Sequence, residues 1–414
     1  MTDAGRRDVF RIPGFFAFWS AYTVSGFGSY VTTLALQVIV LLTLHGTAAD
    51  VGLLNGARWL PYLALGLVVG ALVDRRRRKP VIVGTDLARA VVLAVIPVLY
   101  LVDRLTVPVV IAFVAVFGLL SLFGDAAAQS FLPRVVTRRD LLAAHARTDQ
   151  SDAVAQTAGP VVAGGLVTLI GAPFAVVVDA ASYLFSAVAI WRIRVIEPDT
   201  APTTRRSLRR EIGEGLRWVY RHPVLRPMAV GGHGWFLFNS LLGTAYVPFA
   251  LLGLHLSAAT LGITLAAAGV AALLGSSLST RAGRRWGAGR AVIASNLVMT
   301  AGWVVIALVP TASVAATVGV LAIGQALYGF GLGLSNANEM GYRQAITPDR
   351  LQGRMNTTIR SANRAMIVIG APVGGLLAVT LGYRPTLWIA IAGFLLVAAF
   401  LAASPFRSAR HGGD

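Results

Sequence analysis

The sequence has 414 residues, of which 56% are hydrophobic and 13% are charged, and its mean hydropathy is +0.70. A soluble globular domain carries about twice that share of charged residues, so the composition indicates an integral membrane protein. The formal net charge of +18 could suggest a nucleic-acid ligand. The basic residues, however, lie in short clusters between apolar runs and indicate membrane orientation instead. The absence of cysteine excludes disulfides, thiolate metal sites and a cysteine nucleophile.

Twelve apolar stretches are long enough, at about 1.5 Å per residue, to cross a hydrocarbon core of roughly 30 Å. Only Arg58, Arg104 and Arg384, out of 36 basic residues, fall on one side of the resulting topology. Because basic loops stay in the cytoplasm, we predict a multi-pass protein of the cell membrane with both termini cytoplasmic and no cleavable signal peptide. The predicted spans are 13–43, 51–73, 81–101, 108–127, 147–169, 172–191, 227–252, 258–280, 290–309, 314–337, 357–381 and 384–403.

The second half of the chain repeats the first with an offset of about 210 residues. Phe117-Gly118-Leu119 recurs as Phe330-Gly331-Leu332, and the glycine-rich run at 159–165 is echoed at 370–375. We therefore predict an all-α integral membrane fold in which twelve transmembrane helices form two parallel six-helix repeats. The predicted domains are an N-terminal bundle (1–192), a cytoplasmic linker (193–223) and a C-terminal bundle with a short cytoplasmic tail (224–414).

The linker contains an amphipathic pattern. Leu208, Ile212, Leu216 and Val219 fall on one helical face, opposite Arg209, Arg210, Arg217 and Arg221. We predict a helix that lies along the inner leaflet and is held there by anionic lipid. A solvated linker is the alternative.

A cluster of basic residues follows the second apolar stretch. The segment from Gly70 to Lys79 reads Gly-Ala-Leu-Val-Asp-Arg-Arg-Arg-Arg-Lys. A topology signal needs only the bases, whereas Asp74 adds an acid one helical turn after Gly70. This G-x-x-x-D-R-x-x-R-K pattern resembles the signature between helices 2 and 3 of the major facilitator superfamily, although Arg77 stands where a glycine is usual. The resemblance implies a clamp between the two halves on the inner side, formed by Gly70, Asp74, Arg75, Arg78 and Lys79.

Further motifs resemble the drug and siderophore exporter branch of that superfamily, which contains macrolide efflux proteins and the enterobactin exporter. The resemblance implies proton-driven export of a small molecule from the cytoplasm. The motifs are Asp86-Leu87-Ala88-Arg89-Ala90, Asp179-Ala180-Ala181-Ser182-Tyr183, Glu214-Gly215-Leu216-Arg217-Trp218 with His222-Pro223, and Leu351-Gln352-Gly353-Arg354.

Gly159, Pro160 and Gly164 resemble the glycine-proline motif of facilitator antiporters, with Ala163 where a glycine is usual. Pro160 removes a backbone hydrogen bond, and the small residues beside it allow bending and close helix packing. The element is therefore either an export-specific kink or a packing kink.

Charged residues inside spans are functional candidates by default. Asp179 and Arg58 each lie about seven residues into a span from the outer face, on the order of 10 Å deep, and a pairing between them is left open. Asp125 and Glu339 lie near the inner ends of two spans that line the cavity in the family. Ser29 stands where relatives often carry an acid, so the coupling carboxylate is not obvious. For each of these acids, a satisfied structural group or a solvated helix end is the alternative.

The predicted substrate cavity lies between spans one, four, seven and ten. A mostly apolar pocket with few polar groups suits an amphiphilic, drug-sized compound, but such residues also hydrogen-bond neighbouring helices. Asp149 and Asp152 enter span five by about one turn, where interfacial pairing with Arg147 or its neighbours accounts for them. The candidate cavity residues are Tyr22, Ser25, Ser29, Gln37, His233, Trp235, Asn239, Tyr246, Gln325, Tyr328 and Asn336.

Other classes of protein lack sequence support. A phosphate-binding P-loop, an H-E-x-x-H zinc site and a G-x-S-x-G elbow are all absent from the sequence, so we predict no enzyme, no cofactor and no metal site. We predict a monomeric secondary transporter that exports a small amphiphilic drug, antibiotic or siderophore-like metabolite, coupled to protons. The alternatives are an importer or lipid transporter of the same fold, and a membrane assembly or sensing protein that does not transport.

Overall fold

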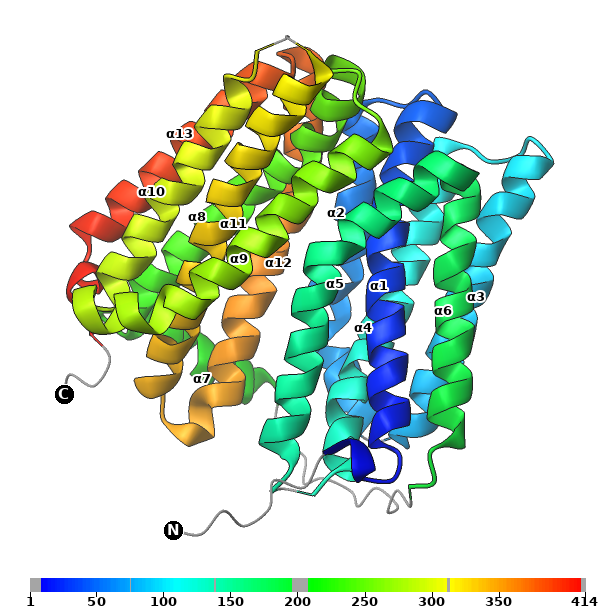
Figure 1. The fold of residues 1–414 in the computed structure, drawn as a ribbon. Coiled ribbons are helices and arrows are strands. Elements are labelled where there is room, and N and C mark those ends of the chain that lie inside the picture. Colours follow the sequence, from blue (N-terminus) through cyan, green and yellow to red (C-terminus); the bar gives the residue numbers. More distant parts are fainter. Residues whose placement is uncertain (1–8, 75, 138, 196–207, 311–312, 411–414) are drawn as a thin grey trace.

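The computed structural model describes residues 9–410 except 75, 138, 196–207 and 311–312, and all regular structure in that part of the chain is helical. The first half consists of α1 (Phe15–Val38), α2 (Ala48–Asp74), α3 (Arg78–Leu101), α4 (Val107–Val135), α5 (Leu141–Ile170) and α6 (Ala172–Arg192). A linker helix, α7 (Leu208–Arg221), follows. The second half consists of α8 (Leu225–Pro248), α9 (Ala258–Trp286), α10 (Ala288–Ala307), α11 (Val314–Ala345), α12 (Asp349–Thr380) and α13 (Tyr383–Ala403) (Figure 1).

The helical membrane fold predicted from composition is confirmed. Eleven helices in the described part of the chain are long and apolar enough to cross a membrane. The remaining predicted span, 51–73, is α2, whose 27 residues also suffice for a crossing. Several predicted spans begin too late in the sequence, since α5 begins at Leu141 rather than 147 and α12 begins at Asp349 rather than 357. The prediction followed apolar residues, whereas these helices continue with polar residues.

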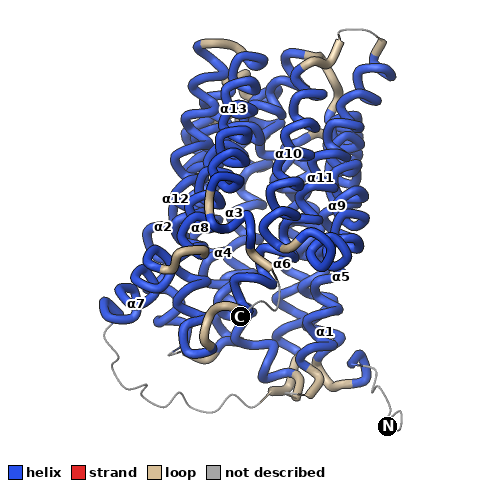
Figure 2. Tube along the Cα trace, turned by 90° about the vertical axis from the view of Figure 1, so that its left-hand side faces the viewer, coloured by secondary structure: helices blue, strands red, loops and turns tan. Residues whose placement is uncertain are grey.

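The helices of each half pack mainly on one another (Figures 1 and 2). In the first half α1 packs on α5 and α6, and α3 packs on α4 and α6. In the second half α11 packs on α9 and α10, and α8 packs on α12 and α13. The halves meet where α2 contacts α12 and where α5 contacts α9. This packing supports the division at residues 192 and 224, which we retain as a proposal.

The backbone repeats between the halves in fine detail. α1 ends in a π-helical turn at Ile39–Thr43, and α8 ends in the same turn at Phe249–Gly253. His45 and His255, at equivalent positions after these turns, both have a φ of 53°. This left-handed conformation is uncommon for residues other than glycine. Two copies of one unusual turn show that the repeat seen in the sequence is also a repeat of local structure.

The first contact between the halves is a close crossing of α2 and α12. A Cβ atom placed on Gly52 would lie 2.5 Å from the carbonyl oxygen of Ala371, and one placed on Gly375 would lie 2.4 Å from that of Ala48. No side chain fits at either position without a backbone shift. The two helices therefore touch backbone to backbone, as small residues permit in membranes.

The second contact repeats the first between α5 and α9. A Cβ atom on Gly262 would lie 2.3 Å from the carbonyl oxygen of Pro160, and one on Gly164 would lie 2.4 Å from that of Ala258. Gly262 is the repeat counterpart of Gly52. The glycine-proline element predicted as a kink thus forms part of the contact between the halves.

Both crossings lie toward the same end of the molecule, which we call the distal end. There, residues 44–47 and 254–257 connect the helices. The other end, where α1 begins, α13 ends and α7 lies, we call the basic end. Toward it the bundles draw apart, at the bottom of Figure 1. A Cβ atom on Gly66, Gly70 or Gly353 would meet nothing within 4 Å. The halves are joined at the distal end and separated at the basic end.

The linker helix α7 packs on the basic end of α12. A Cβ atom on Gly215 would lie 2.5 Å from the Thr358 hydroxyl, and Val219 is fully buried. The Arg354 guanidinium pairs with Glu214 and lies 3.4 Å from Glu211. Part of the face predicted to contact lipid therefore contacts protein, and binding of anionic lipid by α7 stays a prediction.

The crossings predict a strong difference between two neighbouring glycines. Gly164→Ala places a methyl group against the carbonyl oxygen of Ala258 and should destabilise the protein by about 1–3 kcal/mol, as overpacking does. Gly165→Ala is the matched control, because nothing lies within 4 Å of the position of its Cβ atom. Thermal unfolding of the purified protein in detergent measures both. Equal unfolding midpoints for the two variants would show that the close contact has no energetic weight.

Candidate functional site

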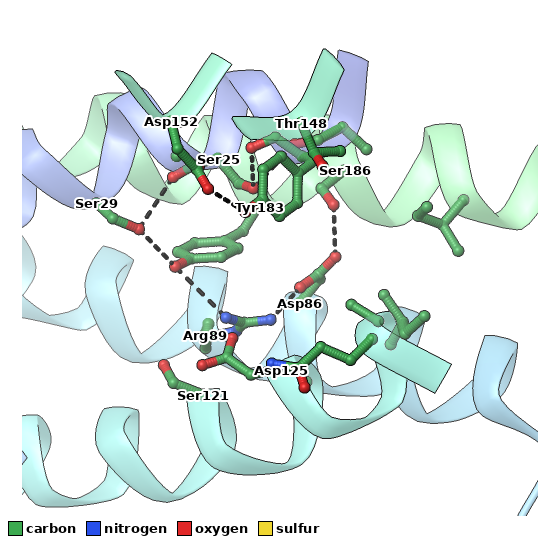
Figure 3. A pocket seen from close by; sticks show the side chains of 18 of the residues that line it. Ser25, Ser29, Asp86, Arg89, Ser121, Asp125, Thr148, Asp152, Tyr183 and Ser186 are labelled. Carbon is green, nitrogen blue, oxygen red and sulfur yellow. Dashed lines mark hydrogen bonds and ion pairs between the residues drawn. The ribbon is translucent and has the colours of Figure 1, made fainter. Parts of the chain in front are cut away.

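The candidate site is a cavity of about 450 Å³ inside the first half, among α1 to α6. Its lining runs from Ser29 and Arg58 near the middle of the bundle to His145 and Ile190 toward the basic end. Aromatic side chains from α1, α2, α4 and α6 form part of the wall. The polar side chains that line it are Tyr22, Ser25, Ser29, Arg58, Tyr62, Asp86, Arg89, Ser121, Asp125, Gln129, His145, Thr148, Asp149, Asp152, Tyr183 and Ser186 (Figure 3).

A buried ion pair on α3 forms the floor of this cavity. Asp86 and Arg89 are only 2% and 7% exposed, and Arg89 pairs with Oδ1 of Asp86. Ser186 on α6 donates a hydrogen bond of 2.6 Å to Oδ2 of the same carboxylate. Gly124 on α4 makes room for the pair, since a Cβ atom there would lie 2.5 Å from Nη2 of Arg89. Charged groups at this depth remain stable only when each is paired and hydrogen-bonded.

Tyr183 on α6 connects this ion pair to α1. The Arg89 guanidinium lies 4.3 Å from the centre of the Tyr183 ring, a cation–π geometry. The Tyr183 hydroxyl lies 3.5 Å from Nη1 of Arg89 and 3.2 Å from the hydroxyl of Ser29. Figure 3 shows the resulting chain of contacts from α1 across α6 to α3.

Two further aspartates accept hydrogen bonds from tyrosines. Tyr62 on α2 donates to Asp125 on α4, and Tyr22 on α1 donates to Asp152 on α5, each over 2.6 Å. The pairing of Asp152 with Arg147 or its neighbours, predicted from the sequence, is wrong, because its described partner is Tyr22. Because α5 begins at Leu141, residue 152 lies about three turns into the helix, on the order of 15 Å from its start.

The cavity carries an excess of acid. Four aspartates line it, at 86, 125, 149 and 152, against two arginines at 58 and 89. The Asp86–Arg89 pair is neutral as a unit. The remaining carboxylates therefore outnumber the remaining guanidinium group, which favours binding of a cation or a proton.

The structure separates two of the predicted charge-coupling residues from each other. Asp179 is fully buried and accepts hydrogen bonds from Thr32 (2.5 Å) and Ser182 (2.8 Å). Arg58 donates instead to Thr33, over 2.5 Å. The two charges thus bind adjacent threonines of α1, and the described residues show no ion pair between them. Arg58 and Asp125 line the cavity, whereas Asp179 does not.

The candidates in the second half bond to neighbouring helices and do not line the cavity. His233 lies between the Tyr220 hydroxyl (2.8 Å) and Oδ1 of Asn363 (2.6 Å). Tyr328 donates to Asn239 over 2.8 Å. Helix-to-helix bonding was the alternative that the sequence left open for such residues, and these pairs follow it.

The other second-half candidates lie apart from the site. Tyr246 is buried with its hydroxyl 2.8 Å from that of Thr264, and Gln325 is buried as well. Trp235, Asn336 and Glu339 line a separate cavity of about 60 Å³, where Glu339 lies 3.8 Å from Arg343. Gln37, on α1, is buried and does not line the 450 Å³ cavity. Of the predicted cavity residues, Tyr22, Ser25 and Ser29 are the ones that line the 450 Å³ cavity.

The basic motif makes a contact within the first half. Nζ of Lys79 donates to the carbonyl oxygen of Ile193, at the end of α6, over 2.8 Å. Gly70 faces open space. Arg75 and the side chain of Asp74 lie outside the described residues. Arg78 has an interaction partner. A clamp between the halves stays a prediction for a conformation in which the basic end is closed.

Sequence reasoning missed the central residues of the site. From the sequence, Asp86 and Arg89 were named only as part of a motif that resembles a family, and Tyr62 was not considered. A signal was present, because an acid and a base three residues apart interrupt the apolar stretch 81–101. Charges inside a span are rarely tolerated without a partner or a function.

The sequence matches the family described as transmembrane secretion effector over residues 6–411. It is 29% identical over 376 residues to the uncharacterized MFS-type transporter y4rN of Sinorhizobium fredii, covering 89% of each chain. It is 30% identical to the multidrug efflux pump Tap of Mycolicibacterium fortuitum over 51% of this chain and 53% of Tap. It is 22% identical to macrolide efflux protein A of Streptococcus pyogenes over 49% of this chain and 50% of that protein.

Solved structures share the fold. The nucleoside transporter NupG superposes with a TM-score of 0.74 at 14% identity, over 94% of this chain and 98% of NupG. A bacterial homologue of the iron transporter ferroportin, in an inward-facing state, superposes with a TM-score of 0.72 at 16% identity, over 97% of this chain and all of that chain.

The buried ion pair gives a prediction for stability. Asp86→Asn leaves Arg89 buried without its carboxylate and should cost about 3–5 kcal/mol, so that little folded protein is recovered. Asp86→Asn combined with Arg89→Gln removes both charges and should restore part of the yield. Asp103→Asn, in an exposed loop, is the control. Yield and unfolding temperature after purification measure the effect, and an Asp86→Asn protein as stable as the control would contradict it.

Proposed function

The chain belongs to the transmembrane secretion effector family of major facilitator transporters, and on that premise we propose that it exports a small amphiphilic molecule from the cytoplasm in exchange for protons. One observation carries the proposal. The cavity of the first half extends toward the basic end, while the glycine crossings join the halves at the distal end. If the basic end is cytoplasmic, as the distribution of basic residues predicts, a substrate loads from inside the cell.

The composition of the cavity supports an amphiphilic substrate with a positive charge. The rings of Tyr22, Trp59 and Phe117 offer apolar contact area, and Asp125 and Asp152 offer negative charge. Aromatic walls and carboxylates together suit an organic cation, by apolar burial and cation–π contact. This balance favours a basic drug or antibiotic over an anionic siderophore-like metabolite.

The names of two relatives support export as the direction. Tap is a multidrug efflux pump and the Streptococcus protein is a macrolide efflux protein, and each matches about half of this chain. Uptake and lipid movement by the same fold remain the alternatives to be tested. A protein that had lost transport would be expected to fill its cavity with bulky side chains, and a cavity of about 450 Å³ argues against that.

Coupling to protons requires a carboxylate that alternates between charge states. Among the candidates, we place Asp125 first because it lines the cavity and accepts its hydrogen bond from a single tyrosine. Asp179 comes second, since Thr32 and Ser182 already hold both of its oxygens. Glu339 lies in the small cavity of the second half. We further propose a monomer in the cell membrane, with α7 near anionic lipid of the inner leaflet.

Export predicts a lower content of substrate in cells that contain the protein. Expression in a host deleted for its own pumps should lower the accumulation of a radiolabelled macrolide, and a protonophore should restore it. Accumulation that rises on expression and collapses with the protonophore would reverse the assigned direction. An anionic amphiphile of similar size tests the charge preference, because the acid excess of the cavity should exclude it.

Coupling predicts that neutral variants lose the response to a pH gradient. In vesicles with an imposed gradient, Asp125→Asn should abolish most gradient-driven transport while substrate exchange without a gradient continues. Asp179→Asn should have a smaller effect, since its oxygens are already hydrogen-bonded to hydroxyl groups. Asp103→Asn serves as the control. If Asp125→Asn and Asp179→Asn both keep gradient-driven transport, coupling lies elsewhere, with Glu339 or His233 as the next candidates.

A further inference from the structure

We infer that Arg364 on α12 is the residue through which the second half responds to charge in the cavity of the first half. This inference deepens the proposed function and rests on it. Few described side chains connect the halves by polar or charged contacts. Asn55 on α2 donates to Thr244 on α8 over 3.3 Å, and the Arg364 guanidinium lies over two rings of α2. Of these, Arg364 alone carries a charge.

The contact of Arg364 is aromatic. Its guanidinium lies 4.2 Å from the centre of the Tyr62 ring and 5.4 Å from that of Trp59. Within the described part of the chain, Arg364 has no carboxylate within ion-pair distance. The half-buried cation is therefore stabilised mainly by the faces of two rings that belong to the other half.

Tyr62 is the only described side chain that joins the two halves and also binds a cavity acid. Its ring contacts the Arg364 guanidinium, and its hydroxyl donates a hydrogen bond of 2.6 Å to Asp125. A phenol that donates to a carboxylate has more negative charge on its ring, which strengthens its attraction for a cation. When Asp125 takes up a proton or binds a cation, the negative charge on the Tyr62 ring decreases. The contact between the halves then weakens without any change in its geometry.

The position of the contact makes this weakening effective. Toward the distal end, Gly56 packs closely on Pro372, so α2 and α12 are held together there. Toward the basic end, Gly66 and Gly70 face open space. Arg364 and Tyr62 lie between these regions, where α2 still packs on α12. A change in this contact alters the balance between conformations closed at one end or the other.

Other charged and titratable groups share the surroundings of Asp125 and act on it together. They are Tyr22 on α1, Tyr62 and Arg58 on α2, Asp86 and Arg89 on α3, His145, Asp149 and Asp152 on α5, Tyr183 on α6 and Arg364 on α12. Of these, only Arg364 belongs to the second half. The charge of Asp125 therefore reaches the second half by way of Tyr62 and Arg364.

Four substitutions separate the parts of this link. Arg364→Gln removes the charge, and Arg364→Lys keeps the charge without the planar guanidinium. Tyr62→Phe keeps the ring and removes the hydroxyl that binds Asp125. Arg360→Gln is the matched control, because it removes the exposed like charge one helical turn before Arg364, while the described ring contacts with α2 belong to Arg364.

The readout is the separation of the halves at the basic end as a function of pH. The full chain has no cysteine, so spin labels attach only at Leu142→Cys and Gln344→Cys, both exposed and in opposite halves. Distance distributions are recorded in lipid vesicles in neutral and acidic buffer. Transport of a radiolabelled macrolide, driven by a pH gradient, is measured in parallel with the same variants.

We expect acid to shift the distance distribution in the unmodified background and in Arg360→Gln. Arg364→Gln and Tyr62→Phe should lose the shift, and Arg364→Lys should keep part of it. Gradient-driven transport by Arg364→Gln should fall by about tenfold, the effect of losing one desolvated cation–π contact. If Arg364→Gln does not insert, Tyr62→Phe and Arg364→Lys decide the question.

The inference is overturned by an acid shift in Arg364→Gln equal to that in Arg360→Gln. It is also overturned if the unmodified chain shows no shift, or if Tyr62→Phe behaves as the control. A normal acid shift without any transport would reject the proposed function and leave the link intact. Transport that depends on the gradient but not on Arg364 would reject the link and leave the proposed function intact.

Discussion

Close contact between backbones, permitted by glycine, is the constraint on which this structure depends. Lipid is as apolar as the side chains of the helices, so burial of apolar area does not hold the halves together. At Gly52, Gly164, Gly262 and Gly375 the helices approach until a carbonyl oxygen occupies the space of a missing side chain. The two crossings are equivalent by the internal repeat. These two equivalent glycine contacts hold the halves together at the distal end and do not hold them together at the basic end.

A charged cluster in the interior of one half follows from the same architecture. The cavity lies inside a six-helix bundle, where groups from α3 and α6 satisfy Asp86 and Arg89 without help from the other half. Such a cluster is costly to build in hydrocarbon, and each charge has a partner that reduces the cost. The carboxylates beyond that balanced pair are the ones that remain available to a ligand or a proton.

The sequence predicted the architecture better than the site. Apolar stretches, basic loops and the offset between Phe117 and Phe330 predicted the helices and the repeat, because these patterns depend on the membrane and on chain connectivity. The site depends on which faces of the helices turn inward, and the sequence does not state that. Tyr62 and Asp125 are 63 positions apart and meet only through the packing of α2 on α4. Asp152 was misplaced because the start of α5 is polar and therefore invisible to an apolar pattern.

The unequal content of the two halves has a consequence for the history of such a chain. A duplicated unit begins with two identical sets of side chains, and among the described residues the 450 Å³ polar cavity is lined by the first copy. In the other copy, residues such as His233, Asn239 and Tyr246 bond to adjacent helices. Drift toward a new ligand can then proceed in the first copy while the second, and the glycine contacts between them, stay unchanged.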